Sequence, residues 1–178
     1  MKITKEKNIY RYRSSGAEGI SLIELLIYIA ILSGLMVIIS DGFIMLSKGR
    51  GQAEARSEVN AAIRFSSELI KQDIKNAGAI VTPALGTSSS TLTLVVGGSY
   101  VTYDAVGGVL RRTENGTTAT TTGGSVLISN PTFTRIENYN ALHGATTTAV
   151  QIALLMGYNA SSTDWTYSNS LRTTVSLR

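Results

Sequence analysis

The longest apolar run of the chain lies near its N-terminus, from Ile20 to Ile39, and contains one charged residue, Glu24. A helix rises about 1.5 Å per residue, so this run spans about 30 Å, the thickness of the hydrocarbon layer of a membrane. A secretory signal peptide has a shorter apolar core, with a small-residue cleavage site directly after it. The only candidate for such a site, Ala53-Glu54-Ala55, lies well beyond the run. The pattern therefore predicts a membrane-spanning helix over residues 20–41.

A second helical pattern follows over residues 52–77, where apolar side chains recur every three or four residues. Gly78 is placed to cap the C-terminus of such a helix. We predict an amphipathic helix within residues 42–79 that continues the membrane helix, and Lys48-Gly49-Arg50-Gly51 allows a bend between them. The charged side chains indicate a solvated face, with contact to another subunit as the alternative. The predicted apolar face consists of Val59, Ala62, Ile63, Leu69, Ile70, Ile74 and Ala77.

Residues 80–178 are patterned as short strands separated by turns. Candidate strands begin at residues 91, 100, 108, 125, 133, 149 and 170, and glycine pairs at 97–98, 107–108 and 123–124 mark turns between them. Alternation is clearest at the end, where Leu171, Thr173, Val175 and Leu177 share a face. Short connections favour antiparallel pairing. The predicted fold is α+β: a long N-terminal helix, half membrane-spanning and half amphipathic, packed on a mostly antiparallel sheet.

The charge of the chain is concentrated in its first residues. Residues 1–19 hold five of the sixteen basic residues and two of the twelve acidic ones, which leaves the remainder close to neutral. A DNA-binding protein requires a basic face on its folded part. The distribution therefore argues against DNA as a partner, despite the high pI.

Residues that carry chemistry are few. The chain has no cysteine and one histidine, His143, so it lacks the residues of an ordinary zinc site, and it contains no G-x-S-x-G motif. Asp104 and Asp164 are isolated acids in turn-rich sequence and are predicted to form turns. The pair Arg111-Arg112 is interpreted as solvated strand residues, with an anion or DNA contact as the alternative. We predict no enzyme, no cofactor and no metal site.

The start of the apolar run carries a family resemblance. A short basic leader ends in Gly19, and Ile20-Ser21-Leu22-Ile23-Glu24 opens the helix. This arrangement resembles the class III signal of type IV prepilins and pseudopilins. The resemblance implies that a membrane prepilin peptidase removes residues 1–19 by cutting between Gly19 and Ile20. It also implies N-methylation of Ile20, although family members commonly have phenylalanine there.

The resemblance implies a role in assembly for Glu24, which would be the fifth residue of the mature chain. In the family this glutamate pairs with the N-terminal amine of a neighbouring subunit. A carboxylate in the first turn of a helix is also favoured by the helix dipole, and an ion pair is far stronger in a low dielectric than in water. The alternative is that Glu24 merely caps its own helix near the membrane interface.

The resemblance implies a structural subunit, expected to be minor, of a type IV pilus or a type II secretion pseudopilus. The β-rich domain and the sequence IKQDIKNAG at residues 70–78 resemble W-type minor pilins and J-type pseudopilins. The implied partners are prepilin peptidase, other pilin or pseudopilin subunits, the inner-membrane assembly platform and, before assembly, membrane lipid. The N-terminus would be cytoplasmic and residues 80–178 extracytoplasmic. The alternative is a membrane-tethered extracellular binding or adhesion module that does not polymerise.

Overall fold

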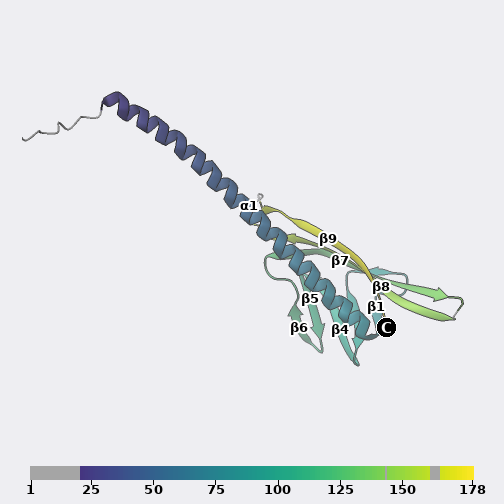
Figure 1. Ribbon diagram of the computed structural model, residues 1–178. Coiled ribbons are helices and arrows are strands. Elements are labelled where there is room, and N and C mark those ends of the chain that lie inside the picture. The colour runs from purple at the N-terminus through teal and green to yellow at the C-terminus, as the bar shows by residue number, and fades with distance from the viewer. Residues whose placement is uncertain (1–20, 143, 161–164) are drawn as a thin grey trace, which may run out of the picture. The chain divides into compact units, whose positions relative to one another are not determined.

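A computed structural model describes residues 21–142, 144–160 and 165–178. The chain divides into two units, residues 1–44 and 45–178. One helix of 55 residues, α1 (Leu22–Asn76), belongs to both units, and its second part lies against strands (Figure 1). The helix is not interrupted at Lys48–Gly51, where the sequence allowed a bend. The predicted α+β class, with a long N-terminal helix packed on antiparallel strands, is confirmed.

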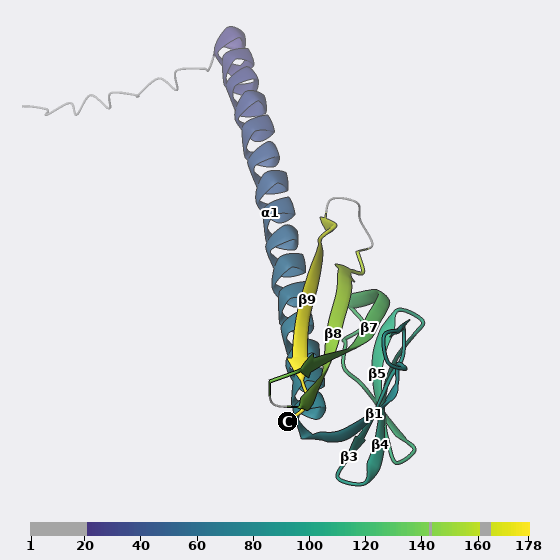
Figure 2. The ribbon, with the colours of Figure 1, turned by 90° about the vertical axis from the view of Figure 1, so that its right-hand side faces the viewer.

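The strands form two antiparallel sheets where the sequence predicted one. The first sheet has the order β1-β3-β4-β5-β6, and the second has the order β2-β7-β8-β9. Figure 2 shows β8 and β9 running beside the second part of α1. The strands of the first sheet are β1 (Ala77–Thr82), β3 (Leu92–Val96), β4 (Ser99–Val106), β5 (Val109–Glu114) and β6 (Thr117–Thr120). Those of the second are β2 (Ser88–Ser89), β7 (Val126–Asn140), β8 (Ala145–Tyr158) and β9 (Ser168–Ser176).

Tight two-residue turns set the register of the first sheet. Gly97-Gly98 joins β3 to β4 and Gly107-Gly108 joins β4 to β5, and all four glycines have positive φ. The turn from β5 to β6 is Asn115-Gly116, also with positive φ at both residues. A type I′ hairpin turn requires positive φ at both central residues, and its twist matches that of the two strands it joins. β6 was not predicted, although an Asn-Gly pair is the strongest short hairpin signal.

The core lies between α1 and the two sheets. The predicted apolar face of the helix is buried at Val59, Ile63, Ile70 and Ile74, and it packs with residues of both sheets in one cluster. The largest fully buried side chains from the sheets are Tyr103, Leu92, Leu94, Leu110, Phe133, Ile152, Leu154 and Met156. Burial of such a contiguous apolar cluster is the main stabilising term of a domain.

The end of the helix differs from the prediction. Gly78 does not cap α1, because the helix ends at Asn76 and Gly78 lies inside β1. Ala77, which the helical spacing included, is the first residue of β1 and pairs with Val96. The last apolar positions of the helical pattern thus continue as a strand on the edge of the first sheet. Helical periodicity alone does not detect this change, since Ala77 is buried in either conformation.

Candidate functional site

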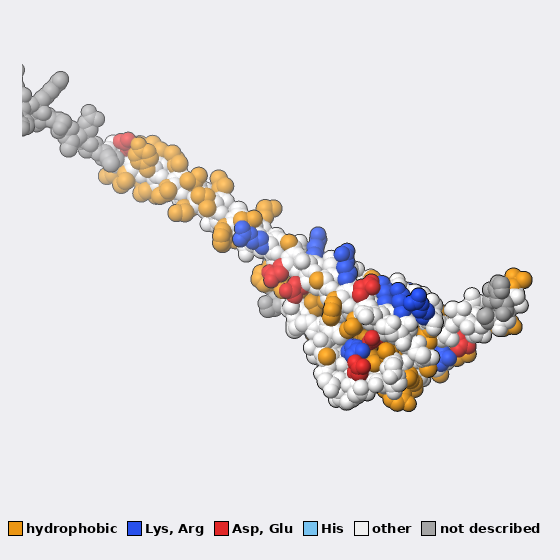
Figure 3. All heavy atoms as spheres, turned by 60° about the horizontal axis from the view of Figure 1, so that its bottom comes forward, with side chains coloured by type: hydrophobic (Ala, Val, Ile, Leu, Met, Phe, Trp, Pro, Cys, Tyr) orange, Lys and Arg blue, Asp and Glu red, His pale blue; other side chains and the backbone are white. Residues whose placement is uncertain are grey.

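The N-terminal part of α1 is apolar on all sides. Every residue from Ser21 to Arg50 is exposed, and α1 is long and apolar enough to cross a membrane. Figure 3 shows these hydrophobic side chains along the helix. A helix that is hydrophobic all round belongs in a lipid layer or in a bundle of helices. Eighteen large hydrophobic side chains contribute: Leu22, Ile23, Leu25, Leu26, Ile27, Tyr28, Ile29, Ile31, Leu32, Leu35, Met36, Val37, Ile38, Ile39, Phe43, Ile44, Met45 and Leu46.

Glu24 lies in the first turn of α1 and accepts a hydrogen bond from a side chain one turn later. The Tyr28 hydroxyl donates to Glu24 Oε1 over 3.0 Å, and both side chains are exposed. Tyr28 was not singled out from the sequence; its spacing of four residues from Glu24 was the available signal. A carboxylate has about four acceptor positions, so this bond leaves Glu24 able to accept a charged partner.

The predicted cleavage site lies outside the described residues. Gly19 and Ile20, the implied sites of cleavage and methylation, are among residues 1–20. The described chain begins at Ser21, whose carbonyl oxygen accepts the first helical hydrogen bond, from the Leu25 N–H, over 3.1 Å. Helix α1 therefore begins directly after the predicted site.

A buried polar cluster links the C-terminal part of α1 to the first sheet. Asp73 is 7% exposed. Its Oδ2 accepts hydrogen bonds from the Tyr103 hydroxyl over 2.5 Å and from Arg112 Nε over 2.7 Å. Arg112 Nη1 also donates to Glu114 Oε2 over 2.5 Å. We call Asp73, Tyr103, Arg112 and Glu114 the Asp73 cluster. It neutralises a buried charge and fixes one helix turn over β4 and β5.

The protonation equilibria of the cluster follow from this packing. Burial raises the pKa of the Tyr103 hydroxyl well above its ordinary value of 10.0, and the Asp73 carboxylate that accepts its hydrogen bond raises the pKa further. The hydrogen bond to Asp73 raises the pKa of the Arg112 guanidinium above its ordinary value. Tyr103 therefore stays a neutral donor and Arg112 a cation. This arrangement holds a helix in place.

The prediction of solvated arginines at 111 and 112 is wrong for Arg112, whose guanidinium lies in the Asp73 cluster. Arg111 pairs with Asp104 through two hydrogen bonds, from Nε over 3.1 Å and from Nη2 over 2.5 Å. Asp104 is also not the predicted turn residue, because it lies within β4 directly opposite Arg111. A cross-strand ion pair explains both residues without an external anion. The other isolated acid, Asp164, lies outside the described residues.

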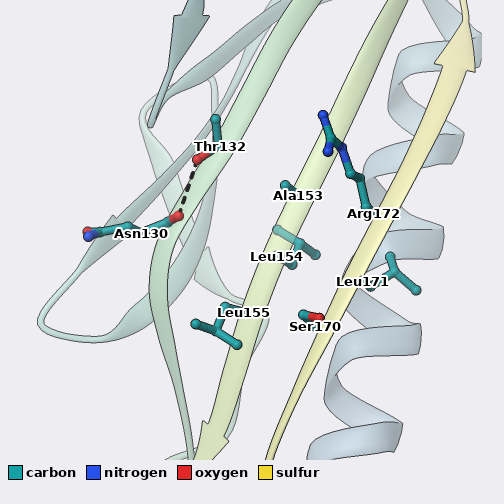
Figure 4. Close-up of a pocket in the computed structure, with 8 residues that line it drawn as sticks. All are labelled: Asn130, Thr132, Ala153, Leu154, Leu155, Ser170, Leu171 and Arg172. Carbon is teal, nitrogen blue, oxygen red and sulfur yellow. Dashed lines mark hydrogen bonds between the residues drawn. The ribbon is translucent and has the colours of Figure 1, made fainter.

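An open hollow of about 260 Å³ lies at β7, β8 and β9 (Figure 4). Its charged side chain is Arg172, which donates to Gln151 Oε1 over 2.6 Å. The register of β7 and β8 shifts beside it, between Ser129 and Thr132. Such a lining can contact a small polar or apolar group, and it lacks the paired acids of hydrolytic sites. The lining residues are Asn130, Thr132, Ala153, Leu154, Leu155, Ser170, Leu171 and Arg172. Within the described part of the chain, no group of three potential metal ligands occurs.

The hairpin of β7 and β8 extends beyond the other strands of its sheet (Figure 1). Pairing with β9 ends at Ala149, and β2 reaches only Thr134. Residues 138–147, which we call the hairpin arm, contain no Asp, Glu, Lys or Arg. Tyr139 is 65% and Leu142 is 94% exposed in this arm. A two-stranded ribbon with an apolar tip is a surface suited to contact with another molecule.

Comparisons with protein-family models, with curated proteins and with solved structures found no match for this chain.

Proposed function

We propose that this chain is a pilin-like structural subunit, which is processed after Gly19 and assembles through the N-terminal part of α1 into a type IV pilus or a type II secretion pseudopilus. The observation that carries the proposal is a helix that is apolar on all sides with a carboxylate, Glu24, in its first turn. A helix that only anchors the domain in lipid does not need that charge, because an apolar residue at position 24 would suit a lipid layer at least as well.

The exposed helix supports assembly because the same surface suits two environments. Before assembly, its apolar side chains contact lipid. In a filament, they contact the equivalent helices of neighbouring subunits. Removal of residues 1–19 creates an ammonium group at Ile20, and Glu24 of a neighbour supplies the opposite charge. Tyr28 supports this role by holding the Glu24 carboxylate through a hydrogen bond of 3.0 Å.

A substitution of Glu24 separates assembly from anchoring. Glu24→Val removes the carboxylate and makes the helix more apolar, so membrane insertion is expected to be at least as efficient as in the wild type. The neighbour's ammonium is then left without a partner, and breaking a buried ion pair costs about 3–5 kcal/mol. We expect processed, membrane-inserted monomer to accumulate, with strongly reduced incorporation into sheared filaments. Crosslinking and filament fractionation measure this.

Asp41→Val is the matched control. Asp41 is the other charged residue between Ser21 and Ser47, and it lies far from the first turn. Its removal changes hydrophobicity in the same direction but leaves the proposed ion pair intact, so incorporation should stay near the wild-type level. Equal incorporation of Glu24→Val and wild type would contradict the proposed role of Glu24. Absence of the chain from all filament fractions would contradict the assembly function itself.

The hairpin arm favours a second candidate function, a membrane-tethered binding module that does not polymerise. A tether uses α1 only as an anchor and presents the uncharged arm, with Tyr139 and Leu142 exposed, to a target. Under this function, Glu24→Val and Asp41→Val behave alike. A double substitution of Tyr139→Ser and Leu142→Ser would abolish adhesion of cells that carry the chain, and their filament content would stay unchanged.

A further inference from the structure

The only tryptophan of the chain, Trp165, lies against α1 at Gly51. A Cβ atom added to Gly51 would lie 2.6 Å from Trp165 Cε2, well inside contact distance, so the indole occupies the space that any other residue at position 51 would need. Gly49, two residues earlier, has nothing within 4 Å of the corresponding Cβ position. Glycine at 51 is therefore explained by the indole.

The chain that follows Trp165 stays beside the helix. The guanidinium carbon of Arg56 lies 5.8 Å from the centre of the Tyr167 ring, a cation–π distance. Further along, the Asn169 side-chain amide donates to Asn60 Oδ1 over 2.7 Å. Three contacts, at Gly51, Arg56 and Asn60, thus fasten residues 165–169 along α1. Trp165 is the contact nearest the apolar part of the helix.

The position of Trp165 along α1 corresponds to the surface of a membrane. The apolar part of the helix ends with Met45 and Leu46, which are 79% and 56% exposed. Gly51 follows five residues later, or about 7.5 Å along the axis. The polar headgroup region extends about 5–8 Å beyond the hydrocarbon on each side of a bilayer. With the apolar residues in hydrocarbon, the indole lies at the depth of the headgroups.

The chemistry around Trp165 suits that depth. Tryptophan and tyrosine favour membrane interfaces because each has an apolar ring and a polar N–H or O–H group. Residues 47–56 contain Lys48, Arg50 and Arg56 against one acid, Glu54. Arg50 and Arg56 are exposed. Cationic side chains beside an apolar segment attract anionic headgroups.

We propose that Arg50 and Trp165 form a face that rests on the phospholipid headgroups of the membrane crossed by α1, whereas Arg56 and Tyr167 lie further along the helix, on the water side of the headgroups. The partner is the bilayer surface, with an anionic phosphate bound by the Arg50 guanidinium and the Trp165 ring placed among the headgroups. The face sets the height of the β-rich domain above the lipid. This inference needs a membrane span and does not depend on filament assembly.

Fluorescence of Trp165 tests the proposal directly, because the chain has no other tryptophan. The full chain is reconstituted into phosphatidylcholine vesicles, with or without phosphatidylglycerol, at a low protein-to-lipid ratio. Lipids brominated near the headgroup should quench the fluorescence more strongly than lipids brominated near the bilayer centre. Phosphatidylglycerol should strengthen the shallow quenching. The variant Arg50→Gln should lose that strengthening while keeping a wild-type near-UV circular dichroism spectrum.

Gly51→Ala should displace the indole, which changes the emission maximum and the ratio of shallow to deep quenching, and Gly49→Ala is its matched control. Both substitutions replace glycine by alanine in a helix, but only the first meets the indole. Wild-type emission and quenching in Gly51→Ala would overturn the contact that the proposal requires. Quenching of wild type by aqueous acrylamide without quenching by brominated lipid would overturn the proposal. Protection from both quenchers would also overturn it, because protein would then cover Trp165.

Discussion

Adjacent residues of β5 have opposite surroundings. Arg112 faces inward to Asp73, and the Arg112 and Asp73 side chains are 21% and 10% exposed. Arg111 faces the other side of the sheet and pairs with Asp104, with both side chains about one-third exposed. Alternate residues of a strand point to opposite faces. The same residue type therefore has two energetic roles at consecutive positions: one compensates a buried charge, and the other adds a solvent-screened ion pair.

Removal of Arg112 should destabilise the domain severely. Arg112→Met leaves the Asp73 carboxylate buried without its cation, and such a loss costs about 3 kcal/mol or more. Arg111→Met is the control, and its loss should be much smaller because its pair is screened by water. Thermal unfolding of the detergent-solubilised chain, followed by near-UV circular dichroism, compares the two variants. Equal losses of stability in the two variants would show that the Asp73 cluster contributes no more to stability than the Arg111–Asp104 ion pair.

The raised pKa of Tyr103 predicts a loss of stability in alkali. The unfolded chain releases the Tyr103 proton near pH 10, whereas the folded chain retains it. The contribution of Tyr103 is therefore complete below pH 10 and declines as pH rises above it, by up to about 1.4 kcal/mol per pH unit. In Tyr103→Phe the free energy of unfolding should fall less steeply between pH 10 and 11.

Tyr100→Phe provides the comparison for the alkaline experiment. Tyr100 lies on the same strand, β4, and is 63% exposed. Thermal unfolding at a series of pH values from 9 to 11 measures the slope for each variant. A slope in Tyr103→Phe equal to that of wild type would mean that the Tyr103 hydroxyl ionises equally in the folded and unfolded states.

At the scale of elements, the sequence predicted those that have a local signal. The apolar run and the helical spacing predicted α1, and alternation with glycine pairs predicted β3, β4, β5, β8 and β9. The two candidate strands at 125 and 133 form one strand, β7, with a register shift between them. Pro131 lies within that irregularity and interrupts the alternation of the strand, so the sequence pattern predicts two strands there.

Elements and contacts that depend on distant residues were missed. β1 pairs with β3, and the two residues of β2 form a strand only through β7. The Asp73 cluster joins residues 30 and 39 positions apart, and no local pattern distinguishes Asp73 from a solvated helix residue. Glu24 was found from its contrast with an apolar run. The contact of Trp165 with Gly51 had no sequence signal, because a glycine can be required at a position for several different reasons.

Residues 45–178 should fold without the preceding part of α1. Every side chain of the core cluster, from Val59 to Val175, lies in this unit. Removal of residues 1–44 eliminates the sixteen exposed large hydrophobic side chains between Leu22 and Ile44. We expect a soluble protein with a single cooperative unfolding transition, measured by near-UV circular dichroism. Residues 21–178 should need detergent. Aggregation of the shorter chain, or a gradual transition, would contradict this.

At the scale of the whole molecule, the two units expose different surfaces. The described residues of the first unit expose apolar side chains along a helix and contribute nothing to the core cluster, whereas the second unit contains that cluster. The chain is therefore consistent with a single-pass membrane protein whose β-rich part is in water. The proposed function adds an earlier event, the removal of residues 1–19.

Processing can be tested on the chain as it is made in a host that contains a prepilin peptidase. Intact mass of the membrane-extracted protein should correspond to a chain that begins at Ile20. Gly19→Val should leave the chain uncut, because the residue before the cleaved bond is changed, whereas Gly16→Val within the leader should be cut normally. A mature chain that begins at Met1 in wild type, or after Ala55, would contradict the proposed processing.

The position of β9 in the sequence affects how the domain is made. β9 pairs with β8 over nine residues, from Gly157–Ser168 to Ala149–Ser176, and packs beside α1. Synthesis at about 5–20 residues per second needs about 1–4 s to proceed from Tyr158 to Ser176. During this interval β8 has an unpaired edge, and such edges promote pairing between chains. The nascent domain therefore passes through an aggregation-prone stage that ends when β9 pairs with β8, and a holding chaperone would act in that interval.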